Sequence, residues 1–238
     1  VNIPCKGIIK KDFLLESIKF IGMNYKTLDV TYHYSFYHEY YRSKSISYKR
    51  FLSFLEIVKK YDNTKILLVS GSKKRKEFDV LTILGNLKND LNKENKFGVV
   101  YNPYFPNEVD LENERNKLFN KFNTGLINSI WFQFGSEYKN LIREIKFIRE
   151  LKNNIIYSLD NKVDIYGSLF IPSKQFLARF KFRPWRNVFL SNEYLNSIEK
   201  AEMITNKIVS IYLENDIIPL IESECSNDKQ LLEARKFI

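Results

Sequence analysis

The chain has 238 residues, of which 44% are hydrophobic and 15% aromatic, and this composition indicates a folded protein with a sizeable core rather than a disordered chain. Its formal net charge of +10 favours phosphate-rich partners such as nucleotides, RNA or anionic lipid, although a solvated lysine-rich surface explains the charge as well. No apolar run approaches the roughly 20 residues of a membrane span, so the sequence predicts no membrane-spanning segment.

The chain contains only two cysteines, Cys5 and Cys225, which lie at its opposite ends. This spacing excludes a disulfide framework and a cysteine metal site, so we expect a reducing compartment, either the cytoplasm or the mitochondrial matrix. Val1 is not an initiator methionine, and we therefore expect upstream residues with room for a targeting segment.

Seven short apolar or alternating segments predict β-strands, and segments with helical spacing alternate with them. The strands are expected at residues 1–5, 28–34, 65–70, 97–101, 127–133, 163–171 and 217–222. Helices are expected after Asp12, at residues 48–61 and 80–91, from Glu114 toward Gly125, at residues 138–151, after Ser173, and at residues 192–214 and 226–238. Gly125 is expected to end its helix through a positive φ, and Gly167 to mark a kink or a close approach of the backbone.

This alternation of strands and helices predicts parallel strands joined by right-handed crossovers. An open doubly wound sheet and a (β/α)8 barrel both fit the pattern. No GxGxxG fingerprint follows any strand, and units repeat at a spacing of roughly 30 residues, so the barrel is favoured. In this register Val1 begins the second strand, and the first strand of the barrel is absent.

The carboxyl ends of barrel strands converge on one face, where binding sites are built. The residues expected there are His33, Ser70–Ser72, Tyr101–Pro103, Gln133, Tyr166–Ser168 and Glu222. Amides, hydroxyls and small residues of this kind suit a planar, partly phosphorylated ligand. Structural roles remain open for each: His33 and Gln133 as buried hydrogen-bonding groups, Tyr101 as a packing residue, and Lys121 as a solvated helix residue.

Several of these segments resemble the methylenetetrahydrofolate reductase family. Lys121, Gly125 and Gln133 stand where that family has a helix lysine, a glycine turn and a substrate-contacting glutamine, with one extra residue between glycine and glutamine. Four further segments resemble family motifs in the same order: HYS at residues 33–35, LLVSGS at 67–72, VVYNPYFP at 99–106 and YGSLFIPS at 166–173.

The resemblance implies a single reductase-like barrel domain over residues 1–238 and a role in one-carbon metabolism. It implies that FAD is contacted by His33, Ser70, Gly71, Ser72, Tyr101 and Lys121. It also implies that Gln133 and Ser168 contact a folate-like substrate.

Two departures from the family pattern imply weak or no reductase activity. The family's catalytic glutamate lies on the first strand, which is absent here, and Ser72 replaces an aspartate that tunes the flavin. Glu39, Glu222 and an upstream residue are the candidates to stand in for the missing acid.

Two readings of function compete with a flavin-dependent oxidoreductase. One is a barrel without catalysis that serves as a subunit or scaffold of a larger assembly, mitochondrial or ribonucleoprotein. The other is independent RNA binding. The basic and aromatic residues are scattered along the sequence rather than arranged in a stripe, which argues against this reading. No histidine or cysteine cluster predicts a metal site.

Overall fold

The computed structural model describes residues 1–4, 13–71, 78–90, 97–156, 163–223 and 227–235 of the chain. The sequence-based expectations for Cys5, Asp12, Ser72 and Cys225 fall outside these residues.

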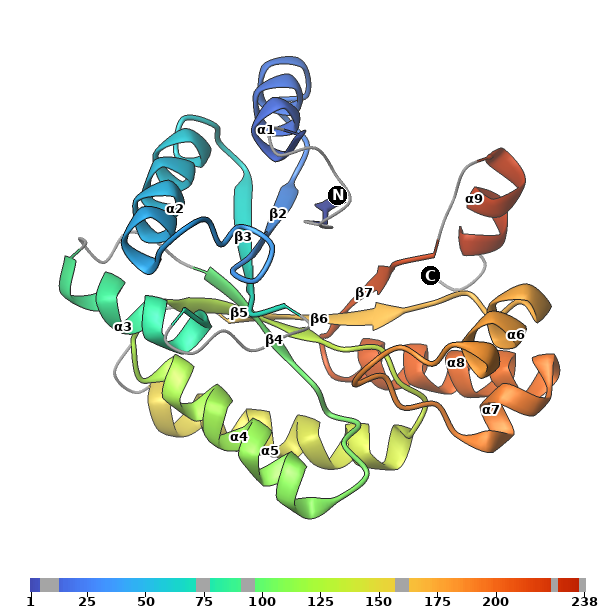
Figure 1. The fold of residues 1–238 in the computed structure, drawn as a ribbon. Helices are drawn as coiled ribbons and strands as arrows, with labels where there is room; N and C mark the ends of the chain where they lie inside the picture. The colour runs from blue at the N-terminus through green and yellow to red at the C-terminus, as the bar shows by residue number, and fades with distance from the viewer. Residues whose placement is uncertain (5–12, 72–77, 91–96, 157–162, 224–226, 236–238) are drawn as a thin grey trace. The chain divides into compact units, whose positions relative to one another are not determined.

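The seven strands follow one another in the order β1-β2-β3-β4-β5-β6-β7, and every register that is defined between two strands is parallel (Figure 1). They are β1 (Asn2–Ile3), β2 (Val30–Ser35), β3 (Thr64–Val69), β4 (Phe97–Tyr101), β5 (Ile127–Phe132), β6 (Asp164–Leu169) and β7 (Ile218–Ile221). Each boundary lies within two residues of the predicted one. The prediction of a parallel α/β fold is confirmed.

Helices alternate with these strands through the described residues. They are α1 (Phe13–Asn24), α2 (Lys44–Val58), α3 (Val80–Asp90), α4 (Glu108–Phe122), α5 (Tyr138–Ile156), α6 (Lys174–Phe182), α7 (Asn192–Asn196), α8 (Ile198–Glu214) and α9 (Asp228–Arg235). The chain after α4 turns at Gly125, whose φ of +75° confirms the predicted left-handed conformation.

Several predicted helix boundaries are wrong: α4 begins at Glu108 rather than at residue 114, α5 ends at Ile156 rather than at residue 151, and serine caps explain two further errors. Helix α2 begins at Lys44 instead of residue 48, because the Ser43 hydroxyl accepts a hydrogen bond from the Ile46 amide at 3.3 Å. The predicted helix at residues 192–214 is two helices, because Ser197 is extended, at φ −138° and ψ 134°, and caps α8 through the Lys200 amide at 3.2 Å. Helix α5, at 19 residues, is longer than either piece.

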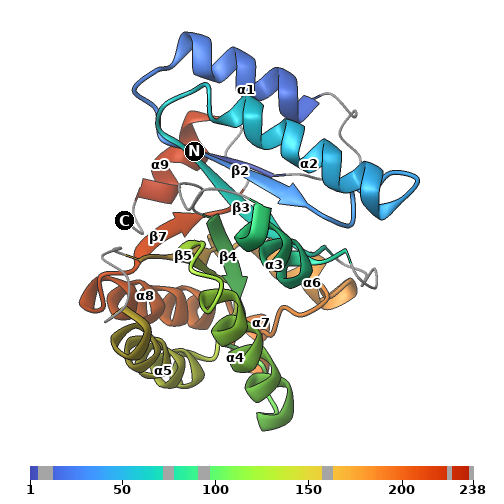
Figure 2. The same cartoon turned by 90° about the vertical axis from the view of Figure 1, so that its left-hand side faces the viewer.

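The chain divides into two compact units. The first comprises Val1–Val99 and Asn120–Asn128, and the second comprises Val100–Phe119 and Ser129–Ile238. Helices α1 and α2 lie side by side in the first unit, and α5 and α8 in the second (Figure 2).

The core of the first unit is largely aromatic where β2 meets α2. The Tyr34 ring lies 4.8 Å from both Phe51 and Phe54 of α2, measured between ring centroids. Since successive side chains of a strand point to opposite faces, Tyr32 and Tyr34 face the helices, while His33 and Ser35 face the other side of the sheet. The strand thus separates a helix-facing aromatic side from a more polar one.

Glycines in the second unit let two tyrosine rings approach the backbone of strand segments. A Cβ atom at Gly167 of β6 would overlap the ring of Tyr212 from α8, and one at Gly135 would overlap the ring of Tyr104. Both rings are fully buried. The predicted close approach at Gly167 is confirmed, and the missing side chain is what makes room for Tyr212.

Candidate functional site

Three polar side chains come together at the carboxyl ends of β5, β6 and β7. Trp131 and Phe132 pair with Tyr166 and Gly167, so Gln133 follows opposite Ser168. Ser168 pairs in turn with Leu220, and Glu222 comes directly after β7. By the alternation of strand side chains, Gln133, Ser168 and Glu222 share one face of this part of the sheet. We call these three residues the polar edge.

Hydrogen bonds fix the side chains of the polar edge. The Ser168 hydroxyl donates to Glu222 Oε1 at 2.8 Å, which joins the ends of β6 and β7. The Gln133 side chain is held through Oε1, which accepts from the Phe134 backbone N–H at 3.2 Å, while the Gln133 backbone N–H donates to the Tyr101 carbonyl at 2.8 Å. Ser168 is buried, Gln133 is half-buried and Glu222 is exposed, so the polar edge runs from the interior to solvent.

A pair of stacked aromatic rings lies next to the polar edge, two residues earlier on the same face. The Trp131 and Tyr166 rings are 4.2 Å apart and nearly parallel, at 19°. Trp131 donates its indole N–H to Ser129 Oγ at 3.1 Å and is buried, whereas Tyr166 is half-buried. The stacked rings therefore form an aromatic surface beside the polar edge, of the kind against which a planar ligand packs.

The opposite face of the same strands holds a chain of buried tyrosine hydroxyls. The Tyr212 hydroxyl donates to the Ser168 carbonyl at 3.5 Å and lies 3.4 Å from the Tyr104 hydroxyl. Burial raises the pKa of Tyr104 and of Tyr212, and it raises the pKa of Tyr194 to about 12. These phenols therefore stay protonated and act as hydrogen-bonding supports behind the site.

Tyr101, a predicted flavin contact, is hydrogen-bonded to a helix of the second unit. Its hydroxyl donates to Glu144 Oε2 of α5 at 2.5 Å. Burial, reinforced by this hydrogen bond, raises the pKa of Tyr101. Arg115 of α4 clamps the same carboxylate with two hydrogen bonds, at 2.9 and 2.7 Å, and Arg143 adds a third at 3.2 Å.

Sequence reasoning missed this buried ionic cluster. The sequence feature that could have revealed it is an acidic residue on an apolar helix face. Glu144 lies between Leu141 and Ile148 at helical spacing and is 0% exposed. A buried carboxylate needs such partners, since its desolvation is otherwise very unfavourable.

The remaining predicted site residues lie in the first unit or outside the described residues. His33 is half-buried on β2, and desolvation lowers its pKa to about 4, so the imidazole is neutral near pH 7. Ser70 and Gly71 follow β3, and Gly71 has a φ of +91° where a Cβ would overlap the Tyr37 side chain. Lys121 lies in the last turn of α4, and Ser72 falls outside the described residues.

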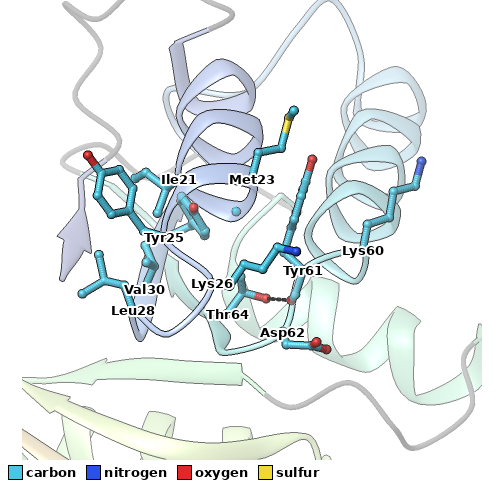
Figure 3. A pocket seen from close by; sticks show the side chains of 12 residues that line it. Ile21, Met23, Tyr25, Lys26, Leu28, Val30, Lys60, Tyr61, Asp62 and Thr64 are labelled. Carbon is cyan, nitrogen blue, oxygen red and sulfur yellow. Dashed lines mark hydrogen bonds between the residues drawn. The ribbon is translucent and has the colours of Figure 1, made fainter.

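The first unit also contains a half-open cavity of about 490 Å³ between the ends of α1 and α2. Figure 3 shows Ile21, Tyr25 and Leu28 on one side of it and Lys60 and Tyr61 on the other. Tyr32 also lines it, is 0% exposed, and has no hydrogen-bond partner for its hydroxyl within the part of the chain that the structure describes. Burial, and next the neighbouring Tyr61, raise the pKa of Tyr32.

Neither a metal centre nor a membrane span is found in the described ranges. No group of three His, Cys, Asp or Glu side chains there is placed to hold a metal ion. None of the helices described combines the length and the hydropathy needed to cross a bilayer.

Comparisons with known proteins add no family. No protein-family model matches the chain, and no curated protein matches it at a significant level.

Proposed function

We propose that the chain is a flavin-dependent oxidoreductase of the methylenetetrahydrofolate reductase type, with weak or no reductase turnover, that binds a folate-like ligand at the polar edge. The observation that supports this most directly is the convergence of Gln133, Ser168 and Glu222 beside the Trp131–Tyr166 stack. Gln133 and Ser168 are the two residues for which the sequence resemblance implies a substrate role.

The chemistry of the polar edge suits the ring of a folate. A pterin ring is planar and carries amino, N–H and carbonyl groups along its edge. The Gln133 amide offers both a donor and an acceptor, and the Glu222 carboxylate accepts from ring N–H groups. A half-buried Tyr166 ring favours a planar ligand through its apolar face.

The proposal that FAD binds rests on fewer observations than the proposed folate site does. When bound, FAD would supply the hydride-transfer chemistry. The Tyr101 hydroxyl is already bonded to Glu144, so it fits a packing role better than a flavin contact. His33, Ser70, Gly71 and Lys121 belong to the first unit and remain the proposed flavin contacts.

Low turnover follows from Ser72, which replaces an aspartate that tunes the flavin in the family the chain resembles. A positioned general acid is worth roughly 10²–10⁴-fold in rate, so turnover depends on which carboxylate of the site takes the role of the family's glutamate. Glu222 is the carboxylate that the polar edge offers in its place, held by the Ser168 hydroxyl. Glu39 lies 3.7 Å from Arg50 in the first unit, so its charge is directed toward an ion pair.

The test uses the purified chain, its visible flavin absorbance, and calorimetric titration with FAD and with methylenetetrahydrofolate. We expect Gln133→Ala to weaken folate binding about tenfold or more, because a ligand group is left without its partner, while FAD binding is retained. Gln175→Ala, on the exposed side of α6, is the matched control. Absence of both flavin and folate binding would contradict the proposal, and equal loss of both in Gln133→Ala would indicate a structural glutamine.

We propose further that the seven strands belong to a (β/α)8-type barrel. The sequential strand order and the parallel pairing support this, since barrels are wound in this way. An experimental structure that showed the sheet open and flat would contradict it.

A second candidate function, a non-catalytic subunit of a larger assembly, is favoured by the free edge of β7. In the described part of the chain β7 pairs only with β6, and Ile218 is 45% exposed. Pro219 sits mid-strand where it offers no N–H, which fits an edge strand. This candidate predicts a flavin-free protein that sediments with a larger particle when isolated at its natural abundance, and a monomeric yellow protein would contradict it.

A further inference from the structure

The second unit contains the longest stretch of the sequence without an acidic residue. Between Asp164 and Glu193 the sequence contains five basic residues and no Asp or Glu, although the whole chain has 28 acidic residues. Helix α6 and the loop that follows it make up most of this stretch (Figure 1). The pattern therefore identifies one local surface rather than a property of the whole molecule.

The basic side chains of this stretch are exposed along α6 and the residues that follow it. Leu177 and Phe180 are buried, and Arg179, Lys181, Phe182, Arg183 and Arg186 are all exposed. We call these five exposed residues the α6 basic face. In the described part of the chain, Arg179, Lys181 and Arg183 have no acidic partner within ion-pair distance.

An aromatic cluster packs against α6 and the start of the loop that follows it. The Trp185 ring lies 5.1 Å from Phe170, 5.7 Å from Phe176 and 5.8 Å from Phe180, between ring centroids. Asn102 donates to the Asn187 carbonyl at 2.9 Å, which anchors the loop two residues later. Trp185 still keeps 37% of its surface exposed. The basic face is thus carried by an anchored platform with aromatic surface available beside the charges.

Ordinary helix stabilisation explains only part of this arrangement. Cations in the last turn of a helix interact favourably with its dipole, which accounts for Arg179 and Lys181. It does not account for Phe182, which is 91% exposed although the hydrophobic effect opposes such exposure. It also gives no reason for the absence of acidic residues over the whole stretch.

We propose that the α6 basic face binds single-stranded nucleic acid, a function separate from the folate site. The cations neutralise backbone phosphates, and the exposed Phe182 ring provides a platform for stacking a base. Every base has an apolar ring face, so the binding is expected to depend little on sequence. RNA and single-stranded DNA share this chemistry, and the experiment compares them.

The test measures binding of the whole chain to fluorescently labelled oligouridylate and oligothymidylate by anisotropy, over a series of salt concentrations. The triple variant Arg179→Gln, Lys181→Gln, Arg183→Gln is expected to bind about tenfold or more weakly, with a salt slope reduced by about 2, because each phosphate contact contributes about 0.7. Phe182→Ala is expected to weaken binding about fivefold or more with an unchanged slope, and Phe182→Trp to retain it.

A second triple variant provides the matched control. Lys139, Lys146 and Arg149 are exposed cations of α5, so changing all three to Gln removes the same charge from another surface of the same unit. This variant is expected to keep most of the affinity. Equal losses in the two triple variants, or no binding of either oligonucleotide near physiological salt, would overturn the proposal. Binding to phosphatidylserine vesicles that depends on Phe182, without oligonucleotide binding, would overturn it in favour of a membrane surface.

Discussion

Two buried tyrosines show that the contribution of the same hydroxyl to stability depends on its surroundings. Tyr101 donates its hydroxyl to a carboxylate that two arginines also hold, whereas the Tyr32 hydroxyl has no partner among the described residues. A hydrogen bond to a charged group stabilises the fold, and an unpaired buried hydroxyl destabilises it. The same substitution should therefore act with opposite sign at the two positions.

Replacing Tyr101 with Phe should lower the free energy of unfolding by about 1.5–3 kcal/mol, because Glu144 loses a charge-assisted hydrogen bond while remaining buried. Urea denaturation of the wild type and the variant measures this. Flavin content measured in parallel checks the role of the side chain. Loss of flavin without loss of stability would place Tyr101 in the cofactor site instead.

Replacing Tyr32 with Phe should raise the free energy of unfolding by about 1 kcal/mol, because the fold no longer buries an unpaired hydroxyl. The ring, which supplies the packing, is kept. The measurement is again urea denaturation, with Tyr101→Phe as the comparison. A clear destabilisation would show that the hydroxyl has a partner in solution, such as a bound water in the adjoining cavity.

At the scale of elements, packing of helices on strands in the second unit depends on missing side chains. Tyr212 of α8 occupies the space above Gly167 of β6, and a Cβ there would overlap its ring. The fit couples a helix and a strand that are far apart in sequence. It also fixes the position of Ser168, whose carbonyl accepts from the Tyr212 hydroxyl.

Gly167→Ala should therefore lower the free energy of unfolding by about 1–3 kcal/mol through overpacking. Gly85→Ala is the matched control, because Gly85 lies within α3 with nothing within 4 Å of the added atom. That change should stabilise the protein by about 0.5–1 kcal/mol through helix propensity. Thermal melts of the two variants give the comparison, and equal effects would refute the overpacking argument.

At the scale of the whole molecule, stability should fall as the solution becomes acidic. Burial lowers the pKa of His33 from 6.5 to about 4, so the unfolded chain binds a proton that the folded chain does not. The contribution of the neutral imidazole is fully present above about pH 6.5, declines as the pH falls, and is lost at about pH 4. At about 1.4 kcal/mol for each pKa unit, the linked change is on the order of 3 kcal/mol.

His33→Asn should reduce this pH dependence between about pH 7 and pH 4, measured as the difference in unfolding free energy between variant and wild type. His38→Asn, at an exposed position of the same unit, controls for the loss of an imidazole. A wild type and a His33→Asn variant with parallel pH profiles would show that His33 is solvated in the native state.

The sequence by itself determined the fold class and the places where strands end. Alternating apolar segments specify strands and helices through local periodicity, and parallel strands bring their carboxyl ends to one edge. The polar residues at the ends of β5, β6 and β7 are therefore identifiable from the sequence, and Gln133, Ser168 and Glu222 do share a face.

Only the tertiary structure decided what each side chain contacts. Apolar periodicity runs on through Ser197, so the break between α7 and α8 depended on a local cap that competes with the helix. Tyr101 ends its strand as expected, yet its hydroxyl is directed to Glu144 because that buried carboxylate needs donors. The cations after Ser173 look scattered in the sequence, and those of α6 are exposed because helical geometry turns Leu177 and Phe180 inward.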